Sequence, residues 1–167
     1  MLPVRNLSVL AIAAALALAL AAGAGASTSR STLSPAAYRA QAGALCTQAS
    51  KRIADLPKSA STKPAELAKK LTKALGAVTP LVPAFRALVP PPAQKALHDT
   101  TVDGLADALR IGNQIAASLA KGGDLAKAMA KVQTPFLRAL STLQSGFKSL
   151  RLTTCQSVLG AALGGVS

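Results

Sequence analysis

Apolar residues recur along this chain at alternating steps of three and four positions, the spacing that lines up one face of an α-helix. The clearest case starts at His98 and continues through Val102, Leu105, Leu109 and Leu119. Runs that alternate apolar with polar residues and are rich in valine, isoleucine or aromatics, the pattern of a strand, are nearly absent. The chain is therefore predicted to be all-α.

Proline residues mark the start of the first helix and interrupt the second. Ser34 can cap the first helix, and Pro35 suits its first position. The second segment, 64–88, contains Pro80 and Pro83, each of which lacks an N–H and crowds the preceding turn. This pattern predicts a kinked second helix or, alternatively, two shorter helices.

The boundary between the third and fourth helices has the sequence KGGD. Gly122 can close the third helix, and Asp124 can cap the fourth, whose apolar face runs from Leu125 to Leu150. Four amphipathic helices joined by short loops predict an antiparallel, up-and-down four-helix bundle. We assign this bundle to residues 34–155.

The first 26 residues have the three-part plan of a secretory signal. Arg5 precedes a continuous apolar run, and Ala24 and Ala26 supply the small residues before a cleavage site. A retained anchor is the alternative, although the run is shorter than the roughly 20 residues of a spanning helix. We expect cleavage, a short polar linker over 27–33, and a secreted or envelope protein without a membrane span.

Cys46 and Cys155 are the two cysteines of the chain. In an exported protein such a pair is expected to form a disulfide, and the absence of C-x-x-C spacing argues against a redox-active pair. Free or intermolecular thiols are the remaining alternative. The bond would clamp the segment after the fourth helix to the first helix. The glycine-rich residues 156–167 beyond it are predicted to be a flexible or loosely docked tail.

The chain is strongly basic, with 19 lysines and arginines against six aspartates and glutamates and a net charge of +13. Such a field attracts anionic surfaces such as membrane or wall polymers. No run of five basic residues occurs, so a basic tail is not expected. The candidate contacts for an anionic surface are the densest groups, Lys51, Arg52, Lys69, Lys70, Lys73, Lys127, Lys131 and Arg138.

Neither specific nucleic-acid binding nor enzymatic activity is expected. The four aromatic residues after the signal all fall on predicted core faces, so none is available to stack on bases: they are Tyr38, Phe85, Phe136 and Phe147. His98 is the single histidine, and no motif around it supplies a nucleophile or a partner base.

Three aspartates, Asp99, Asp103 and Asp107, follow one another at four-residue steps and form one stripe on the third helix. Like charges at this spacing repel, so the stripe is expected to face cations. A metal site that also uses His98 is the alternative. We disfavour it because adjacent residues on a helix, such as His98 and Asp99, point about 100° apart.

Three segments of the sequence give the chain a resemblance to small exported, alanine-rich, two-cysteine helical-bundle proteins of high-GC actinobacterial type. They are YRAQAGALCTQASKRIADLP, LVPPPAQKALH and FKSLRLTTC. The resemblance covers roughly residues 35–156. It implies a helical fold with a disulfide and no catalytic residues, because that group has no assigned activity. The strongly basic balance and the glycine-rich tail depart from the group.

The sequence thus predicts a secreted or envelope-associated, non-enzymatic binding or structural protein that contacts anionic wall or membrane polymers. No cofactor is expected. One alternative is a carrier that holds a small apolar ligand in the bundle core. The other is a metal-dependent enzyme built around His98 and the aspartate stripe.

Overall fold

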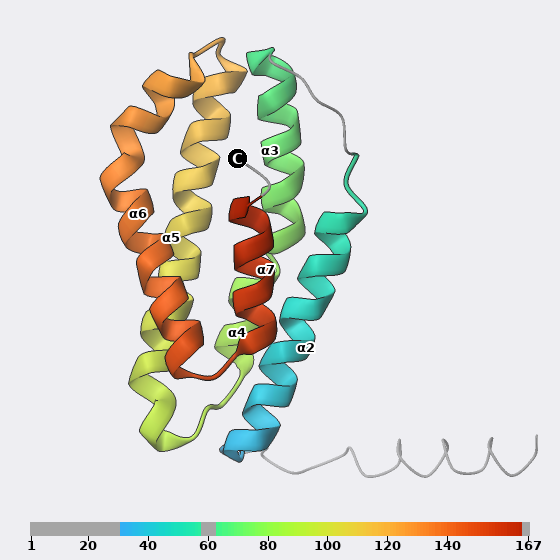
Figure 1. Ribbon diagram of the computed structural model, residues 1–167, viewed down its shortest axis with the longest axis vertical. Coiled ribbons are helices and arrows are strands. Elements are labelled where there is room, and N and C mark those ends of the chain that lie inside the picture. The colour runs from blue at the N-terminus through green and yellow to red at the C-terminus, as the bar shows by residue number, and fades with distance from the viewer. Residues whose placement is uncertain (1–30, 58–62, 165–167) are drawn as a thin grey trace, which may run out of the picture. The chain divides into compact units, whose positions relative to one another are not determined.

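The computed structural model describes residues 31–57 and 63–164, with the side chains of 161–164 left out. The helices in these ranges are α2 (Pro35–Ala54), α3 (Pro64–Val78), α4 (Leu81–Ala87), α5 (Lys95–Ala120), α6 (Leu125–Ser149) and α7 (Thr153–Gly164), with a short 3-10 helix, η2 (Pro92–Gln94), before α5 (Figure 1). No strand occurs in this part of the chain, so the all-α prediction is confirmed. The predicted signal over residues 1–26 lies outside the described residues.

The segment predicted as one kinked second helix is two helices, α3 and α4. A turn at Thr79 and Pro80 separates them. Pro80 has no N–H to continue the helix, and its ring would crowd the carbonyl four residues earlier. Pro83 falls in the first turn of α4, where a backbone N–H needs no partner within the helix. The alternative of two shorter helices therefore describes this region.

Helix α5 occupies the centre of the helical unit, with α6 packed along one side and α3 along the other (Figure 1). Helix α2 packs against α3, α4 and α7. Helix α7 lies in the lower half of Figure 1 and packs against both α2 and α6, which have no extensive contact with each other. The predicted up-and-down bundle of four helices is thus not confirmed, because the second helix is divided and α7 closes the space between the first and the last long helix.

Several helix ends form where the sequence predicted them. The Ser34 hydroxyl accepts a hydrogen bond from the Ala37 N–H at 3.2 Å, and the Asp124 carboxylate accepts one from the Lys127 N–H at 2.9 Å. Gly122 has a positive φ of 78° after the last turn of α5. Glycine adopts this left-handed conformation without strain, which ends the helix and turns the chain toward α6.

The turn from α6 to α7 uses the same geometry without a glycine. Arg151 has a φ of 57°, and the Leu152 N–H donates back to the Phe147 carbonyl at 2.8 Å. Leu152 and Phe147 are both buried, as is usual for residues in these positions of such a helix end. This turn directs α7 over the core, so the predicted tail is helical through Gly164.

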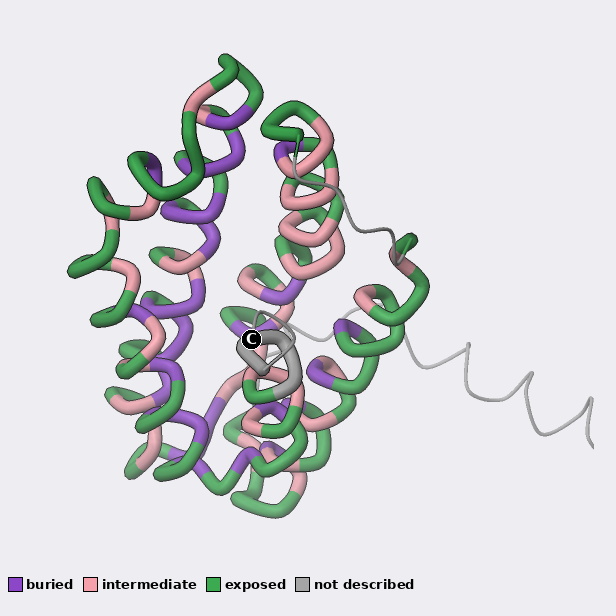
Figure 2. The backbone as a smooth tube through the Cα atoms, turned by 45° about the horizontal axis from the view of Figure 1, so that its top comes forward, coloured by how far each residue is buried: buried purple, intermediate pink, exposed green. Residues whose placement is uncertain are grey.

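The described interior contains two apolar clusters, and α5 contributes to both. Buried residues recur along α5 (Figure 2). The larger cluster lies where α2, α4, α5, the end of α6 and the start of α7 meet. The smaller one lies between α3, α5 and the part of α6 from Ala128 to Ala139. Leu125, predicted to begin the buried face of α6, is 43 % exposed, so the buried face begins at Ala128 instead.

The predicted disulfide between Cys46 and Cys155 is confirmed. The sulfurs are 2.07 Å apart, and the bond joins α2 to the first turn of α7 across a sequence separation of 109 residues. Both cysteines are buried. A structural disulfide is consistent with a location outside the cytoplasm.

Helices α5 and α6 approach each other closely at two glycines. A Cβ atom at Gly146 would lie 2.9 Å from the Thr101 Cβ, and one at Gly104 would lie 2.9 Å from the Thr142 Cγ2. Each glycine of one helix thus receives a threonine of the other, an arrangement that only a residue without a side chain permits at this distance.

Among the helices of the described ranges, none combines the length and the apolar character needed to cross a bilayer.

Candidate functional site

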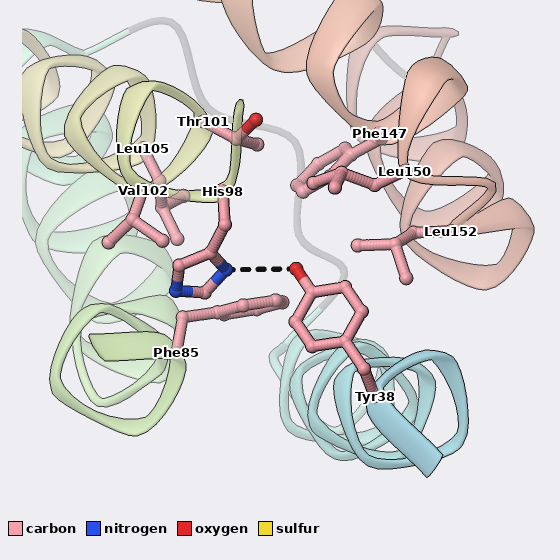
Figure 3. Close-up of a pocket in the computed structure, with 9 residues that line it drawn as sticks. All are labelled: Tyr38, Phe85, His98, Thr101, Val102, Leu105, Phe147, Leu150 and Leu152. Atoms are coloured by element: carbon pink, nitrogen blue, oxygen red, sulfur yellow. Dashed lines mark hydrogen bonds between the residues drawn. The ribbon is translucent and has the colours of Figure 1, made fainter. Parts of the chain in front are cut away.

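A tyrosine–histidine pair lies at the centre of the larger cluster. The Tyr38 hydroxyl on α2 and the His98 Nδ1 on α5 are 2.8 Å apart (Figure 3). Tyr38 is fully buried and His98 is 3 % exposed. The rings of Phe85 and Phe147 pack beside them, with the Phe85 centroid 6.5 Å from those of both His98 and Phe147. The pair is therefore a polar contact inside an apolar core.

Burial fixes the protonation of this pair. It lowers the pKa of His98, an effect that the nearby Lys95 reinforces and that Asp99 and the Phe85 backbone oppose. Burial also raises the pKa of Tyr38 to about 12. Both side chains are therefore neutral, and the tautomer of the imidazole sets which of the two groups donates the hydrogen bond.

The space around the pair is too narrow for a ligand. The nine residues that line it, drawn in Figure 3, leave no room for a water molecule. This packing gives no support, in the described part of the core, to the alternative of an apolar-ligand carrier.

An open groove, the His98 groove, lies on the solvent side of the histidine. Its volume is about 720 Å³, and its apolar lining includes Leu88, Pro90 and Val102. Two ion pairs stand on its rim, Arg86–Asp103 at 3.3 Å and Lys95–Asp99 at 2.6 Å. Two bases and two acids therefore balance at this groove.

The aspartate stripe faces cations, as its spacing indicated. Arg110 pairs with Asp107 at 3.1 Å, so each of the three aspartates has a basic partner. All of these side chains are more than half exposed, and such pairs contribute little stability. His98 points into the core while Asp99 is exposed, and in the described residues no three histidine, cysteine, aspartate or glutamate side chains gather as a metal-ion site. The geometry thus gives the metal-enzyme alternative no support.

A second groove, the lysine groove, brings three predicted contacts together. Lys69, Lys70 and Lys73 of α3 line it, opposite Leu56 and Pro57, which follow α2. Its other lining residues are Glu66 and Ala74, and its volume is about 290 Å³. Glu66 is its single acid and lies 3.1 Å from Lys69. The groove therefore carries an excess of positive charge.

The remaining predicted contacts lie elsewhere. Lys127, Lys131 and Arg138 are exposed on α6, at the opposite edge of the helical unit from α2 (Figure 1). Lys51 and Arg52 are exposed in the last turn of α2. The eight predicted residues thus form separate basic regions, and the α3 lysines are the ones that line a described groove.

We expect the protein to lose stability in mild acid because of His98. Its folded-state pKa lies below the ordinary 6.5, so the unfolded chain binds a proton first as the pH falls. The stabilisation is complete above pH 6.5 and declines as the pH drops toward the folded-state value. The slope for one proton is at most about 1.4 kcal/mol per pH unit. Urea unfolding between about pH 8 and pH 5 measures it.

The matched variant is His98→Gln, which removes the titrating ring. The groups facing His98 are Tyr38 on α2, Lys95 and Asp99 on its own helix, and Arg86 and Asp103 on the groove rim. The hydrogen bond with Lys95 lowers the pKa of Asp99. The stabilisation from Asp99 is therefore complete above its ordinary pKa of 3.8 and is lost only as the pH falls below that value. An unchanged slope in His98→Gln would contradict the assignment.

The sequence pointed to the three lysines by their density, but not to the groove that they share. The Tyr38–His98 pair carried one signal, a lone histidine on an apolar face. The partner of that histidine is 60 positions away in the sequence, and a local sequence pattern cannot identify a contact between residues so far apart. No protein-family model, curated protein or solved structure matches the chain.

Proposed function

We propose that this chain is an exported, non-enzymatic protein of the cell envelope or extracellular space that binds anionic wall or membrane polymers through its basic side chains. The observation that carries the proposal is the unequal distribution of acidic side chains between α5 and α6. Helix α5 holds three of the six acids, each paired with a base, while α6 contains no acid.

Within the described ranges, the basic side chains of α6 have no ion-pair partner. Lys127, Lys131 and Arg138 are exposed, and none of them pairs with an acid in the part of the chain that the structure describes. Their charge is therefore available to a partner rather than neutralised within the fold. Lysine and arginine side chains on separate surfaces attract extended polyanions more readily than one compact anionic ligand.

The location is supported by three observations. The apolar run with Ala24 and Ala26 has the pattern of a cleaved secretory signal, and the buried disulfide suits an oxidising compartment. The resemblance to small exported two-cysteine helical proteins agrees with both. Cleavage would remove only Arg5 from the basic residues, so the exported form keeps the positive field.

The proposal predicts salt-dependent retention on a polyanion. We expect the protein, made without residues 1–26, to sediment with phosphatidylglycerol vesicles or to bind immobilised poly(glycerol phosphate) at about 0.05 M salt. Raising the salt to about 0.5 M should release it, because screening shortens the reach of exposed charges to a few ångströms.

Phosphatidylcholine vesicles and an uncharged matrix are the controls. Retention that persists at high salt, or that is equal on the neutral supports, would contradict electrostatic binding. Failure to bind either polyanion at low salt would overturn the proposed function.

A further inference from the structure

The lysine groove differs from the His98 groove in its charge. Arg86 and Lys95 at the His98 groove are balanced by Asp103 and Asp99. At the lysine groove, three lysines face one glutamate, and Glu66 is engaged with Lys69. The lysine groove thus brings three basic side chains and one acid to a single volume, whereas another described cavity, beside α7, has Lys148 as its one charged lining residue.

The rest of the groove lining is mostly apolar. Leu56 and Pro57, which follow α2, contribute to it, and so does Ala74 of α3. The volume of about 290 Å³ corresponds to about ten water molecules at roughly 30 Å³ each. A small anionic group with an adjoining apolar part therefore fits both the size and the lining.

We infer that the lysine groove binds a phosphate ester, with the phosphate among Lys69, Lys70 and Lys73 and the alkyl part against Leu56 and Pro57. This inference rests on the proposed function and assigns a site within it. Lysine ammonium groups act as point charges that suit a phosphate with several acceptor oxygens. A carboxylate is better matched by the planar fork of arginine, and no arginine lines this groove.

Titration with butyl phosphate, followed by the backbone amide signals of the ¹⁵N-labelled protein, tests the site. We expect saturable shifts in α3 around Lys70 and at Leu56. Inorganic phosphate lacks the alkyl part, and pentanoate replaces phosphate by carboxylate. Both should bind at least about threefold more weakly.

Two triple variants with the same change in charge provide the comparison. Lys69→Gln, Lys70→Gln and Lys73→Gln together should weaken butyl phosphate binding by at least about tenfold. Lys127→Gln, Lys131→Gln and Arg138→Gln on α6 should leave it unchanged. Thermal unfolding of both variants is measured as well. Positive charge near the C-terminal end of a helix such as α2 interacts favourably with the helix dipole, so removing the α3 lysines can also change stability.

The outcomes separate the site from the proposed function. Equal losses in the two triple variants, shifts that never saturate, or tighter binding of pentanoate would overturn the groove assignment, while salt-dependent retention on polyanions would still stand. Loss of the shifts in the α3 variant alone, with its melting temperature kept, supports the groove. Comparing that variant on phosphatidylglycerol vesicles and on poly(glycerol phosphate) then shows whether a lipid headgroup or a polymer supplies the phosphate.

Discussion

Breaking the Cys46–Cys155 bond is expected to lower the free energy of unfolding by about 4–5 kcal/mol. The bond closes a loop of 109 residues, and in the chain-entropy model this restriction of the unfolded state has about that value. A domain of this kind has a total stability of about 5–15 kcal/mol. The expected loss is therefore a large part of the whole.

Two ways of breaking the bond separate its contributions. Reduction of the unaltered protein removes the cross-link and keeps both sulfurs in the core. The double variant Cys46→Ala, Cys155→Ala also removes two buried side chains and should lose slightly more. Urea unfolding of the oxidised, reduced and double-variant proteins gives the three free energies.

The position of the bond also predicts where the reduced protein opens first. The cross-link holds α7 against α2, and α7 has few buried side chains of its own in the described range. Amide hydrogen exchange should therefore rise in α7 before it rises in α5. Reduction that leaves both the stability and the exchange unchanged would show that packing alone holds α7.

Replacing Gly146 by alanine is expected to destabilise the protein by about 1–3 kcal/mol, although alanine is the better helix former. The new methyl group would lie 2.9 Å from the Thr101 Cβ, closer than carbon atoms can approach. Thr101 is buried, and its hydroxyl donates to the Leu97 carbonyl at 2.7 Å, so it has little freedom to move away. Helices α5 and α6 would have to separate.

Gly76→Ala is the matched control. Gly76 lies within α3, and no atom would lie within 4 Å of an added Cβ. This change should stabilise the protein by about 0.5–1 kcal/mol, since alanine loses less backbone entropy in a helix. The same substitution is thus predicted to have opposite signs at two helical positions.

A double-mutant cycle identifies the cause of the Gly146→Ala effect. Thr101→Ala removes Oγ1, the atom nearest to the new methyl group, and Cγ2, and leaves only the contact with Cβ, so the double variant should recover at least about 1 kcal/mol relative to the sum of the single changes. Additive effects, or a stabilising Gly146→Ala, would contradict the close contact between the helices.

The sequence was sufficient for the helical class and for most helix ends. Leucine spacing located α5 and α6, and Ser34, Gly122 and Asp124 each take the capping role that their residue type favours. These features depend on contacts within a few residues. The disulfide followed from the presence of only two cysteines in a chain with a secretory signal pattern.

The arrangement of the helices in space was harder to predict from the sequence. Arg151 adopts a backbone conformation that glycine prefers. Because no glycine occupies this position, the sequence does not indicate the sharp turn after which α7 packs over the core. The exposure of Leu125, which continues the apolar spacing of α6, depends on how the helices pack and not on the local pattern. The grooves likewise form from residues of separate elements, as Leu56 and Lys73 show.

Helix α7 is made after the other described helices, yet it forms a wall of the larger core. Tyr38 is among the first described residues, and its apolar surroundings include Leu150 and Leu152, which directly precede α7. A ribosome that has produced only the first hundred residues has therefore made a chain whose main interior cannot close. Closure of the larger core must therefore wait until the chain has been synthesised as far as Cys155, the last buried residue of that cluster.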